Sequence, residues 1–268
     1  MCHAGWMSVP ARDEIRRSGI GTMADRVRVG LCGFTMAMKA YATLFPVVEI
    51  QTTFYEPPGD ATLLRWRRQT SPALEYTIKV WQLVTHRASS PTYRRMKAPL
   101  DSDAEPGGFR NSVAVAEGWR RSVECANVLG ATGMLFQCPS SFGPTPENVR
   151  ELRGFFERID RPSATLLWEP RGKAWVAERE MALALCRDLQ LTHVVDPFVT
   201  APSMREPVYW RLHGPGGARN SYSDTALRHL HAMLLRVETA GPHYVLFNNL
   251  PRLTDAKRFS HIVAMQAT

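Results

Sequence analysis

Acidic, basic and imidazole side chains recur near the ends of several short apolar stretches of this sequence. Lysine and histidine can transfer protons near neutral pH, and a crowded basic surrounding lowers the pKa of a lysine toward that range. Carboxylates can act as general bases or orient arginine and histidine partners. The residues that we predict to carry proton transfer are Lys79, Glu169, Asp196 and His213.

Further polar residues in the same stretches are suited to hold a substrate. Arginine guanidinium groups bind phosphate or carboxylate through two parallel hydrogen bonds, which favours Arg171 and Arg211 as anion binders. A glycine-rich run starts at Gly214, and its backbone N–H groups can approach a phosphate; a flexible turn is the alternative. The predicted substrate-binding set is Glu49, Gln51, Gln137, Arg171, Arg211, Gly214, Asn248 and Asn249.

A divalent metal ion is an alternative use of the same side chains, because Mg²⁺, Mn²⁺ and Zn²⁺ bind carboxylates or imidazoles. No HExxH or comparable spacing is present, so the sequence requires no cofactor. The five cysteines include no CxxC pair, which argues against a structural zinc site or a disulfide framework. The candidate ligands, if a metal is used, are Glu49, Glu169, Asp196 and His213.

Strand-like and helix-like segments alternate along the chain and must position these residues. Eight such units predict an α/β fold, a single (β/α)₈ TIM-like barrel of parallel strands over residues 23–268. An open doubly wound sheet is the alternative, but no GxGxxG follows the first strand. The expected strands are Val27–Cys32, Val47–Thr53, Glu75–Trp81, Gly133–Cys138, Thr165–Glu169, Thr192–Asp196, Val208–His213 and His243–Asn248. The expected helices are Asp60–Gln69 with Asp60 as N-cap, Ser112–Leu129, Pro146–Ile159, Met181–Leu189, Asp224–Thr239 and Asp255–Met265, with a short stretch near Met38–Phe45.

Alternation along each strand sorts its side chains into an apolar face and a polar face. The apolar faces suit packing against helices, so the polar faces should point into the barrel and meet at the C-terminal ends of the strands. Buried charges must pair or bind a ligand, and a salt-bridge network that only closes the barrel is the alternative reading. The side chains expected to point inward are Val47, Glu49, Gln51, Thr53, Glu75, Thr77, Lys79, Trp81, Gly133, Leu135, Gln137, Leu167, Glu169, Arg171, Val194, Asp196, Tyr209, Arg211, His213, Tyr244, Leu246 and Asn248.

Residues 82–111 form a long insertion after the third expected strand, with several arginines followed by acidic residues. A lid over an anionic ligand and a solvated, partly disordered loop are both open. At the other end, residues 1–22 read as a disordered tail, and Met23 is an alternative start. No apolar run is long enough to span a membrane, and the cysteine usage favours a cytoplasmic protein. The net charge of +8 permits a small anionic molecule or nucleic acid as a partner.

The sequence resembles the YecE-like family, the domain of unknown function 72, from about Val27 to Ala264. This resemblance implies a TIM-like barrel and no established reaction. The chain departs from the family at Gln51, where asparagine is frequent, and at Leu31, where a smaller residue is frequent. The stretches that carry the resemblance are Phe45–Ile50, Thr53–Tyr55, Lys79, Thr85–His86, Leu129–Gly130, Leu135–Pro139, Glu169–Arg171, Trp175, Arg211–Gly214 and Phe247–Asn249.

The leading functional hypothesis is an enzyme, a hydrolase or a lyase- or isomerase-type barrel, that acts on a small anionic or phosphorylated substrate. Acid/base chemistry would take place at the C-terminal ends of the strands. A metal-dependent phosphoester hydrolase, with nucleic acid among its substrates, is one alternative. A non-catalytic protein that binds an anion or a nucleic acid is the other, since fold analogy alone is a weak argument for catalysis.

Overall fold

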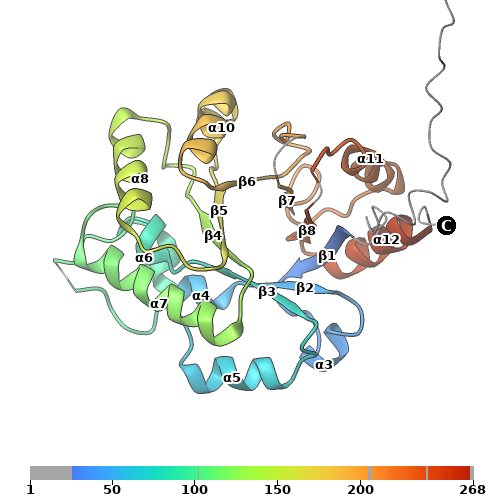
Figure 1. Ribbon diagram of the computed structural model, residues 1–268, viewed down its shortest axis with the longest axis horizontal. Helices are drawn as coiled ribbons and strands as arrows, with labels where there is room; N and C mark the ends of the chain where they lie inside the picture. The colour runs from blue at the N-terminus through green and yellow to red at the C-terminus, as the bar shows by residue number, and fades with distance from the viewer. Residues whose placement is uncertain (1–25, 102, 205–206, 240, 266–268) are drawn as a thin grey trace, which may run out of the picture.

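The computed structural model describes residues 26–101, 103–204, 207–239 and 241–265 (Figure 1). The expected tail at residues 1–22 and the alternative start at Met23 lie outside the described residues. Within the described ranges, no helix is both long and apolar enough to cross a lipid bilayer.

Eight parallel strands pair in the order in which they occur along the chain, and the last strand also pairs with the first. The sheet is therefore a closed barrel, so the predicted (β/α)₈ fold is confirmed and the open doubly wound sheet is wrong. The strands are β1 (Val27–Cys32), β2 (Val47–Ile50), β3 (Glu75–Lys79), β4 (Gly133–Gln137), β5 (Thr165–Glu169), β6 (Thr192–Val195), β7 (Tyr209–Leu212) and β8 (His243–Phe247).

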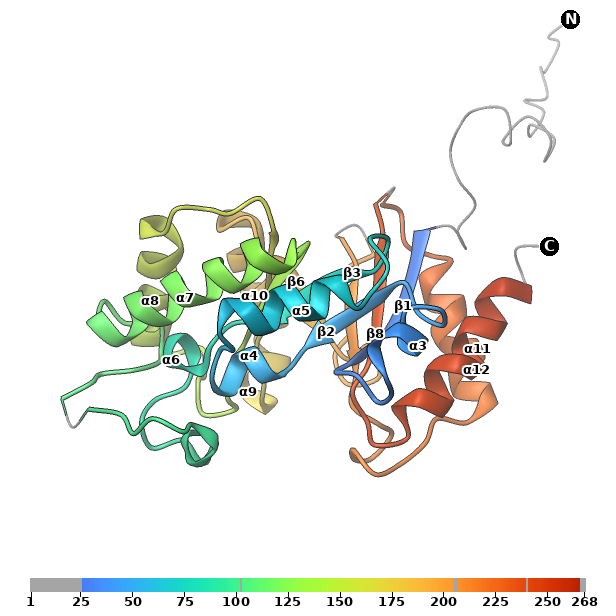
Figure 2. The same ribbon diagram turned by 90° about the horizontal axis from the view of Figure 1, so that it is seen from below.

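Helices follow most strands and pack around the barrel. Figure 1 shows α11 and α12 side by side next to β8 and β1, and Figure 2 shows the short helix α4 where β2 ends. The short helices α6 and α9 follow β3 and β5 along the chain. The helices are α3 (Met38–Tyr41), α4 (Thr52–Tyr55), α5 (Asp60–Arg68), α6 (Gln82–Thr85), α7 (Val113–Leu129), α8 (Pro146–Arg158), α9 (Lys173–Ala177), α10 (Arg179–Asp188), α11 (Asp224–Leu234) and α12 (Arg252–Met265), and a 3₁₀ helix, η1, covers Pro91–Arg95.

Local sequence signals set several helix ends. The Ser112 side chain accepts the backbone N–H of Val115 at the start of α7, and Gly130 ends that helix with a left-handed φ of 61°. Gly130 is therefore the C-cap of α7. Asp60 is not the N-cap of α5, because Gly59 takes that position and Asp60 is the first helical residue.

Two layers of buried apolar side chains follow from the strand alternation. Side chains on the outer strand faces pack with the helices in a large core, as expected for the faces that read as apolar. A smaller cluster fills the barrel interior and confirms the predicted inward faces of six strands. Its members are Cys32, Val47, Leu135, Leu167, Val194, Tyr209 and Leu246, with Tyr244 packed against them.

Gly30 allows β1 and β2 to pair closely at the barrel wall. It lies opposite Val47, and a Cβ atom at position 30 would lie 2.2 Å from the Val47 carbonyl oxygen. We therefore expect Gly30→Ala to lower the free energy of unfolding by about 1–3 kcal/mol or more, the usual range for overpacking. Urea unfolding measures this loss. Gly143→Ala is the matched control, since no atom lies within 4 Å of its Cβ position, and an equal loss in both variants would contradict the argument.

Residues 80–112 connect β3 to α7 and contain α6 and η1. The end of this segment packs back on its beginning, because the N–H groups of Gly107 and Phe109 donate to the carbonyls of Leu83 and Val84. Phe109 is fully buried. Its ring lies among four other phenylalanine rings, those of Phe136, Phe142, Phe155 and Phe156. The expectation of a solvated, partly disordered loop therefore fails for residues 107–109.

Candidate active site

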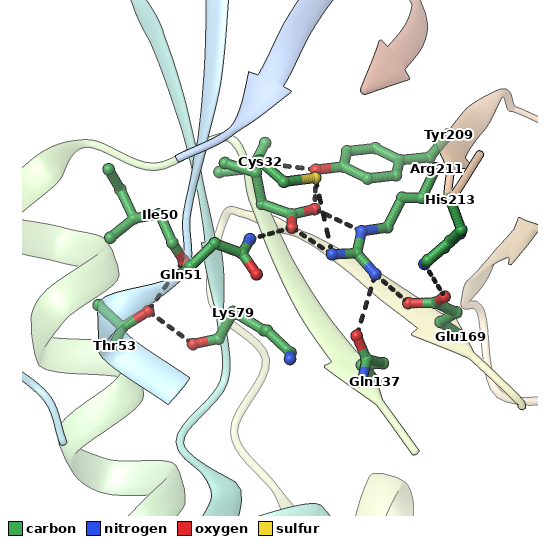
Figure 3. A network of polar contacts seen from close by, with 12 residues as sticks. Cys32, Ile50, Gln51, Thr53, Lys79, Gln137, Glu169, Tyr209, Arg211 and His213 are labelled. Carbon is green, nitrogen blue, oxygen red and sulfur yellow. Dashed lines mark hydrogen bonds and ion pairs between the residues drawn. The ribbon is translucent and has the colours of Figure 1, made fainter. Parts of the chain in front are cut away.

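The predicted polar residues of several strands meet inside the barrel mouth, where β2, β4, β5 and β7 end (Figure 3). The barrel geometry explains this, because parallel strands bring their C-terminal residues to one edge. The predicted residues that contact one another there are Glu49, Gln51, Gln137, Glu169, Arg171, Asp196, Arg211 and His213.

Arg211 is the centre of this group and is fully buried. Its Nε and Nη2 atoms donate to the two carboxylate oxygens of Glu49, at 3.1 and 2.8 Å. Nη1 donates to Gln137 Oε1 at 3.0 Å and to Glu169 Oε2. Nη2 lies 3.6 Å from Cys32 Sγ. The five N–H groups of the guanidinium are thereby matched by five contacts within the protein.

Tyr209 and Cys32 complete the surroundings of the two buried carboxylates, although neither was in the predicted site. The Tyr209 hydroxyl donates to Glu49 Oε2 at 2.8 Å and lies 2.7 Å from Thr77 Oγ1. Strand alternation placed Tyr209 inside the barrel, which was a usable signal, whereas nothing in the sequence linked Cys32 to an arginine. We call Cys32, Glu49, Gln137, Glu169, Tyr209 and Arg211 the Arg211 cluster.

The charges of the Arg211 cluster stabilise one another. Burial alone would raise the pKa of Glu169, but Arg211, His213 and Arg171 outweigh it and hold the pKa well below its usual range. Burial likewise opposes the charge of Arg211, and the Glu169 and Glu49 carboxylates outweigh it and raise the pKa of the guanidinium. Both groups are therefore ionised at neutral pH.

Lys79 lies at the end of β3 and is 6% exposed. Its Nζ atom lies 3.6 Å from the centre of the Phe54 ring, a cation–π contact. Thr53 fixes the end of the strand, because its hydroxyl donates to the Lys79 carbonyl oxygen at 2.7 Å. Figure 3 shows the Lys79 amine pointing away from Thr53 and toward Gln137. Thr53 itself lies in α4, so the expected extension of the second strand to this residue is wrong.

The surroundings of Lys79 favour its neutral form. Burial lowers the pKa of Lys79 to about 7, and the positive charges of Arg211 and Arg171 add to this effect. The carboxylates of Glu169 and Glu49 offset only part of it, since both are already paired with Arg211. About half of the Lys79 side chains therefore carry a free amine at neutral pH.

His213 follows β7 and lies between two carboxylates. Its Nδ1 atom is 3.5 Å from Asp196 Oδ2, which also accepts the His213 backbone N–H at 2.9 Å. Nε2 is 3.3 Å from Glu169 Oε1 but is not aligned for a hydrogen bond. Burial would lower the pKa of His213, but the two acidic partners outweigh it and raise the pKa above 6.5. The surroundings of His213 therefore favour its protonated form.

A small cavity of about 180 Å³ opens beside His213 and its two carboxylate neighbours. Glu169, Arg171, Asp196 and His213 line it together with apolar side chains that include Trp175. The Arg171 side chain is 40% exposed, and its Nε lies 3.7 Å from Glu169 Oε1. Unlike Arg211, Arg171 has donors free to meet a ligand.

Three predicted binding residues lie at the edge of the site or outside it. The Gly214 N–H donates to the Tyr222 hydroxyl at 2.9 Å, so this amide is already bonded. Asn248 is partly buried at the end of β8, and its backbone N–H donates to the Leu212 carbonyl. Asn249 is fully buried and donates to Asp255 Oδ2 in α12 at 2.7 Å, away from the Arg211 cluster.

His86 is a buried neighbour of Lys79 that was not among the predicted site residues. Its ring packs on the edge of Phe54, with ring centres 4.8 Å apart, and its Nδ1 lies 2.8 Å from Thr85 Oγ1. Burial, with Lys79 and Arg171 nearby, lowers the pKa of His86 to about 3. A neutral His86 and Phe54 therefore form an uncharged wall beside the amine.

The four candidate metal ligands do not converge on one point. Glu49 directs both oxygens at Arg211, while Glu169 lies between Arg211 and His213. Among the described residues, no three His, Cys, Asp or Glu side chains are grouped closely enough to hold a metal ion. These residues therefore do not fit a divalent metal in the arrangement described.

Comparison with known proteins gives a family and a fold. The sequence model of a family described as "Protein of unknown function DUF72" matches residues 33–267, and no curated protein matches the chain. A DUF72 family protein from Enterococcus faecalis V583 is 20% identical with a TM-score of 0.68, covering 89% of this chain and 97% of the other. One from Thermotoga maritima MSB8 is 21% identical with a TM-score of 0.67, covering 89% and 99%.

A more distant structure, a xylose isomerase domain containing protein from Salmonella typhimurium LT2, has a TM-score of 0.54 and 12% identity. It covers 93% of this chain and 98% of its own. At these identities the similarity concerns the fold, and the chemistry must be argued from the side chains.

Proposed function

The chain belongs to the DUF72 family, whose function is unknown, and we propose that it is an enzyme that transfers protons on a small anionic substrate. The observation that carries this proposal is a pair of basic groups at one barrel mouth, Lys79 and His213, whose pKa values are shifted in opposite directions. Burial lowers the pKa of Lys79 to about 7, and the two carboxylates beside His213 raise its pKa. Opposed shifts of this kind supply a base and an acid at one pH.

The charge balance of the site favours an anion. Arg211 offsets one of the two negative charges of Glu49 and Glu169, and Arg171 and His213 lie against Glu169, so the two carboxylates repel an incoming anion less than they would unpaired. Arg171 offers exposed guanidinium donors at the cavity, and protonation of Lys79 would add a second positive charge once an anion is bound. A phosphate or a carboxylate of a small metabolite meets these requirements.

The proposed roles divide the predicted residues into two sets. Lys79 accepts a proton as the free amine, and His213 donates one with Asp196 fixing its orientation. Arg211 works at a distance, because its donors are occupied and its effect is to keep Glu169 ionised and to hold both carboxylates in place. Activity as a metal-dependent phosphoester hydrolase receives no support from the arrangement of the acidic side chains.

Anion binding tests this proposal directly. We expect inorganic phosphate or a small phosphorylated metabolite to bind the purified protein, and Arg171→Ala to weaken binding about tenfold or more, as for loss of a charge-assisted hydrogen bond. Isothermal titration calorimetry measures both dissociation constants. Arg150→Ala is the matched control, because Arg150 is exposed on α8, and it should leave the affinity unchanged. Equal affinity in wild type and Arg171→Ala would reject the site.

The same titrations should depend on pH. A bound anion favours protonated Lys79 and His213, so binding takes up protons around pH 7, and the affinity falls as pH rises through the pKa of Lys79 at about 7. Calorimetry in two buffers of different ionisation enthalpy counts the protons taken up. A Lys79→Met variant should take up fewer protons than wild type.

A further inference from the structure

Lys79 is set apart from the other charged groups of the barrel mouth by having no carboxylate partner. Arg211 donates hydrogen bonds to both Glu49 carboxylate oxygens and to one Glu169 oxygen, so these three acceptors are directed at the guanidinium and not at Lys79. Within the described residues, Lys79 Nζ has the Phe54 ring as its contact and no hydrogen-bond acceptor or ion-pair partner. An amine held this way keeps its lone pair available.

We propose that Lys79 is a covalent catalyst that forms a Schiff base with the carbonyl carbon of a small anionic aldehyde or ketone. This inference rests on the proposed function, to which it adds the carbonyl class of the substrate. The position of Lys79 at a strand end directs its amine into the mouth, beside Gln137 (Figure 3). The free amine that this reaction requires is present in about half of the molecules at neutral pH, since burial lowers the pKa of Lys79 to about 7.

The first step forms the C–N bond. The lone pair of neutral Lys79 Nζ adds to the carbonyl carbon, and the π electrons of the C=O bond move to oxygen. That oxygen takes one proton from protonated His213, while the new ammonium nitrogen loses one proton to solvent or back to His213. The product is a neutral carbinolamine, and nothing is oxidised or reduced.

The second step releases water. Protonated His213 donates a proton to the hydroxyl oxygen, the C–O bond breaks, and the nitrogen lone pair forms the C=N bond. One water leaves and a protonated imine remains. The positive imine replaces the ammonium form of Lys79, and the charges of the Glu169 and Glu49 carboxylates favour it as they favour the ammonium form.

Binding of the anionic end of the substrate falls to residues that the Arg211 cluster leaves free. Arg171 has exposed donors, and Gln137 uses its Oε1 atom for Arg211, which leaves the Nε2 amide to donate. The uncharged wall of Phe54 and His86 suits the carbon skeleton next to the carbonyl. A substrate of few carbon atoms with one carboxylate or phosphate fits this division.

Reductive trapping tests the inference on the intact protein. The full chain is incubated at pH 7 with sodium cyanoborohydride and one carbonyl probe, in separate reactions for glyoxylate, pyruvate and dihydroxyacetone phosphate. The rate of alkylation of each lysine is then measured by peptide mass spectrometry. We expect at least one probe to alkylate Lys79 about tenfold faster or more than exposed Lys173, because far more of Lys79 is the free amine. The pyruvate product is an N-carboxyethyl group on Lys79.

Variants and a neutral probe define the controls. Lys79→Arg should lose the fast labelling, and Lys173→Arg should keep it. Arg171→Ala should slow labelling by pyruvate while leaving labelling by hydroxyacetone, which has no charge, unchanged. In urea all lysines should react at similar rates. Because the wild-type peptide map locates the reacting lysine by itself, the result does not depend on any variant folding.

The outcomes separate the two proposals. If Lys79 reacts no faster than Lys173 with all three anionic probes, the Schiff-base inference is wrong. Where phosphate still binds and Arg171→Ala still weakens that binding, the proposed acid/base function stands without it. If pyruvate labels Lys79 equally fast in wild type and in Arg171→Ala, the covalent role of Lys79 stands and the assignment of Arg171 to the anion is wrong.

Discussion

Arg211→Met is expected to lower the free energy of unfolding by about 3–5 kcal/mol, the range measured when one member of a buried ion pair is removed. The substitution removes the guanidinium that pairs with both Glu49 and Glu169 and leaves Glu169 with Arg171 and His213 alone, and both carboxylates are nearly inaccessible to water. Methionine fills part of the volume but cannot donate to either carboxylate. Urea unfolding followed by circular dichroism measures the change, and a loss below about 1 kcal/mol would show that the cluster is not a coupled unit.

A rescue variant separates charge from packing. Adding Glu49→Gln and Glu169→Gln to Arg211→Met removes the stranded charges, so the triple variant should recover part of the lost stability. Arg153→Ala is the surface control, because its ion pair with Asp188 is exposed and should contribute less than about 1 kcal/mol. A triple variant less stable than Arg211→Met would contradict the electrostatic explanation.

Acid should weaken the Arg211 cluster only at low pH. The pKa of Glu169 is held well below its ordinary value in the folded protein, so the unfolded chain binds its proton first as pH falls. The stabilisation from Glu169 is therefore complete above the unfolded pKa, near 4, and is lost as pH falls through the lower folded pKa.

Lys79→Met should have the opposite sign and raise the stability of the protein at pH 7 by about 2–4 kcal/mol. Folding lowers the pKa of this lysine from 10.5 to about 7, which corresponds to a ceiling of about 5 kcal/mol against the folded state. Methionine has a similar unbranched stem and carries no charge, so it removes this cost and keeps the contact with Phe54. The thermal midpoint and the urea midpoint should both rise.

The pH dependence distinguishes this effect from improved packing. Between pH 7 and 10.5 the unfolded wild-type chain holds the Lys79 proton more tightly than the folded chain, so wild-type stability from this group rises with pH. The advantage of Lys79→Met should therefore shrink toward pH 10 and be full below pH 7. Lys173→Met, at an exposed position, should show neither effect, and a constant advantage for Lys79→Met at all pH values would point to packing.

The expected results for Arg211→Met and Lys79→Met differ in sign, so we expect stability and function to oppose each other at position 79 and not at position 211. A buried amine without a partner is unfavourable for the folded protein, and the same condition makes it a base or a nucleophile. A more stable Lys79→Met protein that also loses trapping and proton uptake would fit both statements.

The barrel could be predicted from the sequence because its strands are short, apolar on one face and regularly spaced. β1 and β5 begin and end where predicted, and the other six strands end one to three residues earlier than expected. β7 also begins one residue later than expected. The differences have a common cause at the mouth, where the chain turns into loops or short helices. After Ile50, at the end of β2, the chain enters α4. This helix has only four residues, too few to show a helical periodicity in the sequence.

The site could be predicted only as a set of inward polar residues. Alternation gave the facing of Glu49, Glu169 and Arg211, but which donor meets which acceptor depends on side chains from strands far apart in sequence. The sequence could not predict that all the N–H donors of Arg211 are used within the protein. It therefore could not predict that Arg171 is the arginine left for a ligand. Asn249 was expected beside Asn248 in the site, yet the next residue along a strand end faces the other way and reaches Asp255.

The Arg211 cluster also constrains the order in which the chain can mature on the ribosome. Its carboxylates come from residues 49 and 169, whereas its guanidinium lies 162 and 42 residues later in the chain. A nascent chain that stops before β7 carries two inward carboxylates without their counter-ion, and it also lacks the last two strands of the wall. The charge-paired barrel interior can therefore be completed only after β7 has been synthesised, in the final quarter of the protein.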